Sequence, residues 1–164
     1  MAPIALEIRP VNWQKPDESH AVVEVLDSYA THPIGGGVPL ATQVKEKLCD
    51  ELSKRPQALV LLAWSEGKAV GLVIAFEGFS TFAARPLLNI HDLAVLPKFQ
   101  CRGVGKALMT AVEAEATQRG CCKLTLEVLE NNQHARKLYE NFGFASYQLD
   151  PAAGRALFLE KKLI

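Results

Sequence analysis

A segment near the middle of the chain, Gln100 to Ala107, has the residue types of an anion-binding turn. An apolar, strand-like run from Ile90 to Leu96 precedes it, and an apolar stripe at helical spacing follows from Val104. A turn that joins a strand directly to a helix leaves the first N–H groups of the helix unpaired, and with the helix dipole these groups favour phosphate. The segment also holds two glycines, which let a ligand approach the backbone, and two basic side chains: Gly103, Gly105, Arg102 and Lys106. The sequence therefore predicts a phosphate-binding turn at residues 100–106, called the cradle below.

Two common phosphate-binding motifs do not fit the cradle. A P-loop would need glycine in place of Gln100 and serine or threonine in place of Ala107. The dinucleotide fingerprint would need a third glycine in place of Leu108, and it normally lies in the first βαβ unit of a chain. Both motifs are therefore excluded.

The composition of the chain excludes several classes of protein. With 164 residues, of which 49% are apolar and 22% charged, it is expected to form one domain over residues 1–164 with a substantial core. The formal net charge is zero, so neither nucleic acid nor an anionic membrane surface is expected as a partner. No apolar run approaches the roughly 20 residues of a membrane helix, and the N-terminus lacks a secretory signal pattern. The four cysteines form no metal-binding pattern, so we expect free thiols in the cytoplasm and no metal.

Hydrophobic periodicity predicts the elements that position the cradle. Alternating or continuous apolar runs predict about seven strands, and apolar stripes with capping signals predict about four helices. The expected strands are 5–11, 57–64, 69–76, 88–96, 123–129, 144–149 and 156–163, and the helices are expected to begin near residues 16, 42, 104 and 133. Most neighbouring strands in this order of elements are expected to be joined as hairpins, and one βαβ crossover is expected at the cradle. The predicted fold class is therefore α+β, with a mixed, mostly antiparallel central sheet flanked by the helices.

A second motif follows the cradle after one further strand. It reads Asn132-x-x-Ala135-x-x-Leu138-Tyr139-x-x-x-Gly143-Phe144, while the cradle and its next residue read Gln-x-x-Gly-x-Gly-x-Ala. In this order and about one strand apart, the two motifs resemble those of the GNAT superfamily of N-acetyltransferases. The resemblance covers residues 88–144, and the order of elements along the whole chain agrees with the GNAT fold. It implies acetyl-CoA as the cosubstrate and requires no metal.

The resemblance also implies which residues would contact the cofactor. In the family, the strand before the cradle splays away from the next strand, and the pantetheine arm of acetyl-CoA lies in the gap. The splayed strand and the main-chain N–H groups of the cradle would then hold the cofactor through Leu93, Ala94, Val95, Gln100, Cys101, Arg102, Gly103, Val104, Gly105 and Lys106. Asn132 would also contact the cofactor, and it would cap its helix as well.

By the same resemblance, Tyr139 would lie near the thioester sulfur, contacting the cofactor and acting as general acid. A phenol at that place can protonate the leaving thiolate. The alternative for Tyr139 is a packed aromatic side chain beside Leu138 and Phe142. The tetrahedral oxyanion needs a backbone N–H donor, which the family takes from the splayed strand, near Ala94 here.

The resemblance does not fix the general base. One histone-modifying branch has glutamate where this chain has Asn89, and the diamine-modifying branch has adjacent acids where this chain has His91 and Asp92. Strand alternation predicts that these two side chains point to opposite faces, so at most one would face a given substrate. Each is equally well explained as a structural polar group, and Glu127 is a third candidate with an exposed-face alternative. His91 and Asp92 are the preferred candidates.

The expected function is direct transfer of an acetyl group from acetyl-CoA to a primary amine of a small molecule, either diamine-like or amino-acid-like. Two alternatives stay open at this point: a non-catalytic module that binds or senses acyl-CoA, and an acetyltransferase acting on protein N-termini or lysines. Family members often pair through their two C-terminal strands, so a homodimer is also expected.

Two segments outside the motifs are candidates for the acceptor site. The glycine-rich loop 31–39 joins two helices whose counterparts line that site in the family, and His32 would be its substrate contact. The alternative for this loop is a floppy surface connector. Phe79 and Phe82 would wall the acceptor pocket, or they would pack in the core.

Overall fold

Five strands form the sheet in the computed structural model, which describes residues 4–147, 150, 152, 154 and 156–163. The strands are β1 (Glu7–Pro10), β2 (Ala58–Ser65), β3 (Lys68–Ser80), β4 (Arg85–Val95) and β5 (Leu124–Leu126). They lie in the order β1-β2-β3-β4-β5, antiparallel from β1 to β4, with β5 parallel to β4. The parallel pair is the βαβ crossover that the sequence predicts around the cradle.

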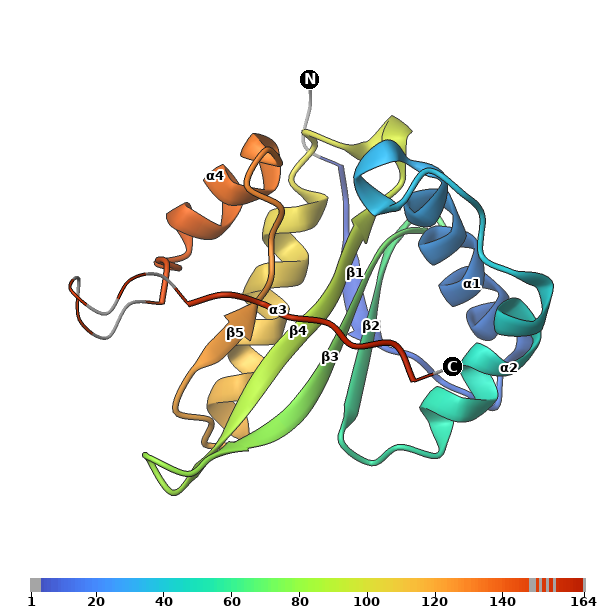
Figure 1. The fold of residues 1–164 in the computed structure, drawn as a ribbon. Coiled ribbons are helices and arrows are strands. Elements are labelled where there is room, and N and C mark those ends of the chain that lie inside the picture. The colour runs from blue at the N-terminus through green and yellow to red at the C-terminus, as the bar shows by residue number, and fades with distance from the viewer. Residues whose placement is uncertain (1–3, 148–149, 151, 153, 155, 164) are drawn as a thin grey trace.

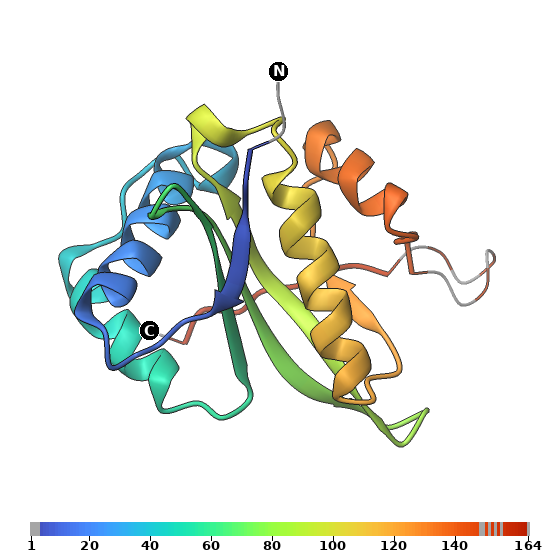
Figure 2. The same cartoon turned by 180° about the vertical axis from the view of Figure 1, so that it is seen from behind.

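Helices cover both faces of the sheet (Figures 1 and 2). They are α1 (Pro16–Thr31), α2 (Thr42–Ser53), α3 (Val104–Gln118) and α4 (Gln133–Asn141), with two short 3-10 turns, η1 (Pro33–Gly35) and η2 (Pro97–Phe99). Side chains of α1 and α2 share one apolar core with the sheet, and side chains of α3 and α4 share the other. The sheet is therefore the middle of three layers.

The central hairpin follows directly from its sequence. β2 is a continuous apolar run, and it is buried on both faces. The two turn residues between β2 and β3, Glu66 and Gly67, have positive φ angles of 50° and 75°, as a tight two-residue hairpin requires. The turn thereby fixes the register of β2 against β3.

A buried carboxylate fixes α1 to the first strand. Glu18 is only 3% exposed, and its Oε2 accepts hydrogen bonds from Arg9 Nη1 and from the backbone N–H of Asn12, each at 2.8 Å. These bonds join the first turn of α1 to the end of β1. They therefore set where α1 lies on the sheet.

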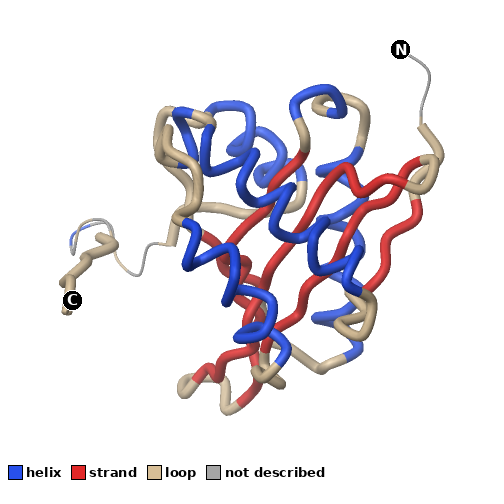
Figure 3. The backbone as a smooth tube through the Cα atoms, turned by 90° about the vertical axis from the view of Figure 1, so that its right-hand side faces the viewer, coloured by secondary structure: helices blue, strands red, loops and turns tan. Residues whose placement is uncertain are grey.

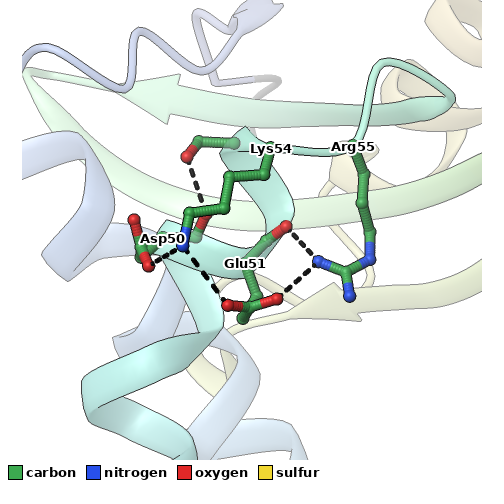
Figure 4. Close-up of polar contacts among 5 residues, drawn as sticks. Asp50, Glu51, Lys54 and Arg55 are labelled. Carbon is green, nitrogen blue, oxygen red and sulfur yellow. Dashed lines mark hydrogen bonds and ion pairs between the residues drawn. The ribbon is translucent and has the colours of Figure 1, made fainter.

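α2 ends in an exposed cluster of ion pairs (Figure 4). Lys54 Nζ lies 2.5 Å from a carboxylate oxygen of Asp50 and 3.4 Å from one of Glu51, and Arg55 pairs with Glu51 at 2.9 Å. Water screens such pairs, so they contribute little to stability. Their effect is to keep the end of α2 solvated.

The two C-terminal strands expected from the sequence do not form in the described residues. Residues 144–147 and 156–163 contain no strand, and residues 148–149 of the first expected strand lie outside the described part. Figure 3 shows the end of the chain standing apart from the sheet. Apolar alternation is a local pattern, whereas a strand also needs a neighbouring edge that accepts its hydrogen bonds. The expected count of seven strands is therefore wrong for the described residues, where β5 forms the edge.

Candidate functional site

The parallel ladder between β4 and β5 is short, and the two strands do not pair beyond it. Its paired residues are Leu88 with Leu124, Asn89 with Thr125 and Ile90 with Leu126. β5 ends at Leu126, three residues before the expected boundary at Leu129, while β4 continues to Val95. In the described chain, residues 91–95 of β4 therefore have no strand on this side. This is the splayed arrangement that the GNAT resemblance predicts.

A β-bulge in β4 turns His91 and Asp92 to the same face of the sheet. Asp92 pairs with Ile74, and the next residue of β3 pairs with Ile90, so His91 is the extra residue. Directly paired residues share a face, and Ile74 belongs to the core under α1 and α2. The His91 ring meets Phe76 of that same core edge-on, with 4.9 Å between ring centroids. The expectation that these two side chains point to opposite faces is therefore wrong, because the bulge interrupts the alternation.

Asp92 is a half-buried carboxylate that forms no hydrogen bond or ion pair with the described residues. Burial raises the pKa of its carboxyl, and the charge of His91 partly opposes that shift. Burial and the Asp92 charge together raise the pKa of Tyr29, which lies on α1. His91, in contrast, is exposed. Of the two candidate bases, Asp92 is therefore the one in a shielded environment.

The cradle presents unpaired backbone N–H groups at the start of α3. The first hydrogen bond of the helix runs from the N–H of Ala107 to the carbonyl of Gly103, at 2.9 Å. Within the described chain, the N–H groups of Val104, Gly105 and Lys106 donate to no protein acceptor. A row of free donors at the positive end of a helix dipole is a site for phosphate oxygens.

Two residues of the cradle have a left-handed backbone. They are Gly103, with φ of 88°, and Cys101, with φ of 58°. Such a turn curls the chain so that successive N–H groups converge on one concave surface. The Gln100 amide nitrogen donates to the carbonyl of Val95 at 3.3 Å and so holds the turn against the end of β4.

The two basic side chains of the cradle differ in their surroundings. The Arg102 guanidinium lies over the ring of Phe99, 5.6 Å from its centroid, and the Nε atom is buried with no hydrogen-bond partner among the described residues. Lys106 is exposed. Stacking therefore keeps one positive charge close to the cradle, while the other is free to move.

A cavity of about 210 Å³ lies between the cradle, α4 and the C-terminal end of α1. Its lining brings together several residues that the sequence singled out: Leu93, Val95, Gln100, Cys101, Gly105, Asn132 and Tyr139. The remaining predicted residues do not line it. Ala94 is buried on the face of the sheet that α1 and α2 cover, and His91 and Asp92 face the same side. The cradle residues that do not line the cavity are Arg102, Gly103, Val104 and Lys106.

The cavity is also lined by residues outside the motifs and segments that the sequence singled out. Ser28 and Tyr29 come from the end of α1, and His134 comes from α4. A tyrosine inside an apolar helix stripe gives no sign in the sequence that it reaches a cavity. Tyr29 is placed there by the packing of α1 on the sheet.

Tyr139 is almost buried where α4 meets the cavity. Its side chain is 9% exposed, and its ring lies 5.9 Å from that of Phe144. Burial, with a smaller effect of Tyr29, raises the pKa of Tyr139 to about 12. The phenol therefore stays protonated at neutral pH, so it can donate a proton but is not a base.

Asn132 caps α4, as its sequence position predicts. Its Oδ1 accepts a hydrogen bond from the N–H of Ala135 at 3.2 Å. The cap leaves the side-chain NH₂ of Asn132 free to donate elsewhere, and the residue lines the cavity.

The loop after α1 contains a hydrogen-bonded turn. The N–H groups of Gly35 and Gly37 both donate to the carbonyl of His32, at 2.8 and 3.0 Å. A Cβ on Gly35 would lie 2.1 Å from the carbonyl oxygen of Tyr29, so only glycine lets the turn pack so closely on α1. His32 and Ile34 thereby line the cavity. The loop therefore contains a hydrogen-bonded turn at residues 32–37, and most of its residues are exposed.

The phenylalanines of the β3–β4 connection lie in neither place expected of them. Phe79 is 63% exposed and Phe82 is fully exposed, because the β3–β4 hairpin extends beyond the helices that cover the sheet. The expected core position is therefore wrong, and neither residue lines the cavity beside the cradle. Glu127 is also exposed and does not line the cavity.

Two further features are absent from the described residues. No group of three or more His, Cys, Asp or Glu side chains there is placed to hold a metal ion. None of the described helices combines the length and the apolar character needed to cross a membrane.

Comparison with known sequences identifies relatives of this chain. The family model described as Acetyltransferase (GNAT) family matches residues 16–144. The uncharacterized N-acetyltransferase YhfO of Bacillus subtilis is 31% identical over 88 residues, which cover 54% of this chain and 59% of YhfO. The [ribosomal protein bS18]-alanine N-acetyltransferase of Haemophilus ducreyi is 34% identical over 116 residues, which cover 62% of this chain and 79% of that protein.

Comparison with solved structures supports the fold. The structure of AAC(6')-Iy in complex with the bisubstrate analog CoA-S-monomethyl-acetylneamine superposes with a TM-score of 0.75 at 20% sequence identity. The superposition covers 96% of this chain and 99% of that one. At this identity the likeness concerns the fold alone.

Proposed function

This chain belongs to the acetyltransferase (GNAT) family, and we propose that it transfers an acetyl group from acetyl-CoA to a primary amine. The family match confirms the resemblance found in the two motifs, together with the α+β GNAT fold and the N-acetyltransferase class. One observation carries the proposal: the unpaired N–H groups of residues 104–106 lie beside a cavity that is lined by Tyr139.

The residues present fit acetyl-CoA at two separate places. The free N–H groups of the cradle suit the pyrophosphate, and the unpaired edge of β4 at residues 93–95 suits the amides of the pantetheine arm. The thioester would then reach the cavity between Asn132 and Tyr139. The complex of AAC(6')-Iy with a CoA-containing bisubstrate analog supports this choice of cosubstrate.

The chemistry needs a neutral amine, an oxyanion donor and an acid. A backbone N–H near Ala94 would stabilise the tetrahedral oxyanion. Tyr139, held protonated by its raised pKa, would give its proton to the leaving thiolate. Asp92 is preferred over His91 as the proton acceptor, because it is half-buried and its carboxylate has no partner in the described chain.

The acceptor is proposed to be a primary amine of a small molecule, diamine-like or amino-acid-like. The cavity of about 210 Å³ beside the cradle would receive the amine end of the acceptor. The alanine N-acetyltransferase of H. ducreyi makes that acceptor class the one to test beside it.

The proposal also covers the compartment, the domain organisation and the oligomeric state of the enzyme. We place it in the cytoplasm as one GNAT domain over residues 1–164 that forms a homodimer. Support for the dimer is a row of apolar side chains near the C-terminus that are at least 73% exposed: Leu157, Phe158, Leu159 and Leu163. Sedimentation velocity over a range of concentrations would detect the dimer, and a monomer throughout would contradict it.

The cofactor site is tested with a matched pair of variants, Cys101→Asp and Cys101→Asn. Cys101 is exposed in the cradle and has a positive φ that both Asp and Asn tolerate. The two replacements have nearly the same shape, but only Asp adds a negative charge beside the free N–H groups. Calorimetric titration should show acetyl-CoA binding weakened about tenfold or more by Cys101→Asp, and little changed by Cys101→Asn.

The transfer itself is tested by amine-dependent release of CoA. An alanine-starting peptide, a free amino acid and putrescine represent the protein N-terminal, amino-acid-like and diamine-like acceptors. Release with any of them, and a smaller rate for Cys101→Asp at subsaturating acetyl-CoA, supports the proposal. Equal binding by the two variants would contradict the placement of the phosphates. Tight acetyl-CoA binding without release would instead favour the acyl-CoA-sensing alternative.

A further inference from the structure

The cavity beside the cradle has a polar side that the proposed function does not use. Its polar residues on the α1 side are Ser28, Tyr29 and His32, whereas those of the cradle and α4 are assigned to acetyl-CoA. No Asp, Glu, Lys or Arg side chain of the described chain lines this cavity. The α1 side is therefore left for the acceptor, and the second ammonium group of a diamine would meet no carboxylate there.

His32, directly after α1, offers a hydrogen-bond donor to a molecule in the cavity. Its Nδ1 accepts a hydrogen bond from the backbone N–H of Ile34 at 3.3 Å. In the neutral ring the hydrogen therefore lies on Nε2, which forms no hydrogen bond with the described residues. Protonation of the ring leaves Nε2 a donor and adds a positive charge. In either state Nε2 suits a carboxylate or carbonyl oxygen and cannot accept from an ammonium group.

Ser28 adds a second donor one helical turn before His32. Its hydroxyl has no partner among the described residues, whereas the Thr31 hydroxyl donates to the carbonyl of Asp27 at 2.6 Å. The carboxylate of Asp27 accepts from Lys45 Nζ at 2.6 Å and from a backbone N–H at 2.7 Å, and it does not line the cavity. The acid next to Ser28 is therefore already paired on the side of α2.

The dipole of α1 opposes a carboxylate at this place, because the cavity lies at the negative end of that helix. A helix dipole contributes less than a hydrogen bond to a charged group, and His32 and Ser28 offer two such bonds. The start of α4 also borders the cavity, through Asn132 and His134, and it presents the positive end of its own dipole. The donors therefore outweigh the opposing dipole.

We propose that His32, assisted by Ser28, binds a carboxylate of the acceptor, so that the acceptor is a free amino acid and not a diamine. This assignment rests on the proposed function. The amine would face the thioester, and the carboxylate would face His32, which is exposed at the edge of the cavity. His32 is then a specificity-determining residue that takes no part in the bond-making steps.

The test compares His32→Asn and His32→Asp with a control, His20→Asn. Asn and Asp both place an oxygen where Nδ1 lies, so the turn at Ile34 still forms as an Asx turn, while the donor at Nε2 is lost. The two replacements have nearly the same shape and differ by one negative charge. His20 is exposed on α1 and does not line the cavity, so its variant repeats the chemical change elsewhere. Calorimetry measures acetyl-CoA affinity for every variant.

The acceptors separate a carboxylate from the groups that resemble it. They are glycine, β-alanine and 4-aminobutyrate, the amide of each, an alanine-starting peptide and putrescine. Each amide keeps the carbonyl oxygen and nearly the shape of its acid but lacks the charge. The parent protein should give a kcat/KM for at least one of the three amino acids that is about tenfold or more above its amide and above putrescine.

His32→Asn should raise KM for the preferred amino acid about tenfold and change kcat little, because the lost hydrogen bond is remote from the reacting atoms. His32→Asp should raise KM further, because its carboxylate repels that of the acceptor. The ratio of kcat/KM between the acid and its amide should fall about tenfold or more in His32→Asp. His20→Asn should match the parent, and acetyl-CoA affinity should stay within about threefold in every variant.

Three results would overturn the carboxylate assignment. They are a parent that prefers putrescine, the peptide or an amide to every amino acid, equal losses for acid and amide in the His32 variants, or a parallel drop in acetyl-CoA affinity that marks a rearranged turn. These results leave the proposed function intact, because the parent protein still releases CoA. No CoA release by the parent with any acceptor would overturn the proposed function, and this assignment with it.

Discussion

Gly71 in β3 lies directly beneath Val104, the first residue of α3. A Cβ placed on Gly71 would be 2.8 Å from Val104 Cγ1, 3.1 Å from Leu108 Cδ1 and 3.2 Å from the carbonyl oxygen of Ala94. Val104 and Leu108 are fully buried, so neither can easily move away. The glycine therefore lets α3 begin close to the sheet, and it sets where the free N–H groups of the cradle lie beside β4.

Gly71→Ala should damage both stability and cofactor binding. The added methyl group has to displace the start of α3, and overpacking of this kind typically costs about 1–3 kcal/mol. The same displacement should weaken acetyl-CoA binding. Urea unfolding and calorimetry measure the two effects. Gly78→Ala in the same strand is the control, because its Cβ would meet only Leu87 at an ordinary 3.4 Å. Equal stability of the two variants would show that Gly71 is not a close contact.

Tyr139→Phe should lower kcat about 100-fold or more while leaving acetyl-CoA affinity within about threefold of the parent. The ring and its packing against Phe144 remain, and only the proton donor is lost. Because the pKa of Tyr139 is raised to about 12, the parent should show no loss of activity from ionisation of this acid up to about pH 10. An unchanged kcat in the variant would leave Tyr139 with a packing role only.

The same pKa shift predicts a stability effect at high pH. The unfolded phenol ionises near its ordinary value of 10, whereas the folded one stays protonated to about 12. Between these values the unfolded state binds fewer protons, so stability falls as pH rises. Below about pH 10 Tyr139 adds no pH dependence. Urea midpoints of Tyr139→Phe should therefore fall less steeply than those of the parent from pH 9.5 to 11, and parallel curves would contradict this.

Local patterns predicted the parts of the fold that depend on nearby residues. The apolar run of β2, the turn at Gly67, the start of α3 at Val104 and the cap at Asn132 were all readable from the sequence. In each case the determining residues lie within a few positions of one another. The cradle follows from the same kind of information, because it is a strand, a turn and a helix in succession.

Features that depend on a second segment of chain were not predictable in this way. The bulge at His91 exists only relative to the register of β3, and Tyr29 reaches the cavity only because α1 packs on the sheet. The expected strand at residues 156–163 does not form for the same reason, because its apolar pattern does not specify which edge of the sheet it would pair with. The sequence therefore predicted the local geometry of the cradle better than the packing around the cavity.

Glu18→Gln should destabilise the protein by about 1.5–3 kcal/mol at neutral pH, the range for hydrogen bonds to a charged group. The hydrogen bond from Arg9, followed by the backbone N–H of Asn12, holds the pKa of Glu18 below its ordinary value of 4.5 even though burial opposes this. Glutamine keeps the shape of the side chain and loses the charge that Arg9 binds.

The stability that Glu18→Gln loses should depend on pH in one direction. Because the folded pKa of Glu18 is lowered, its contribution is fully present above about pH 4.5 and disappears as pH falls through the folded value. The difference between the parent and Glu18→Gln, measured by urea unfolding, should therefore narrow from pH 5 downward. Glu24→Gln on the exposed side of the same helix is the control and should change stability by less than about 0.5 kcal/mol. A gap between the parent and Glu18→Gln that stays constant at low pH would mean that side-chain shape, and not the charge, holds α1 to β1.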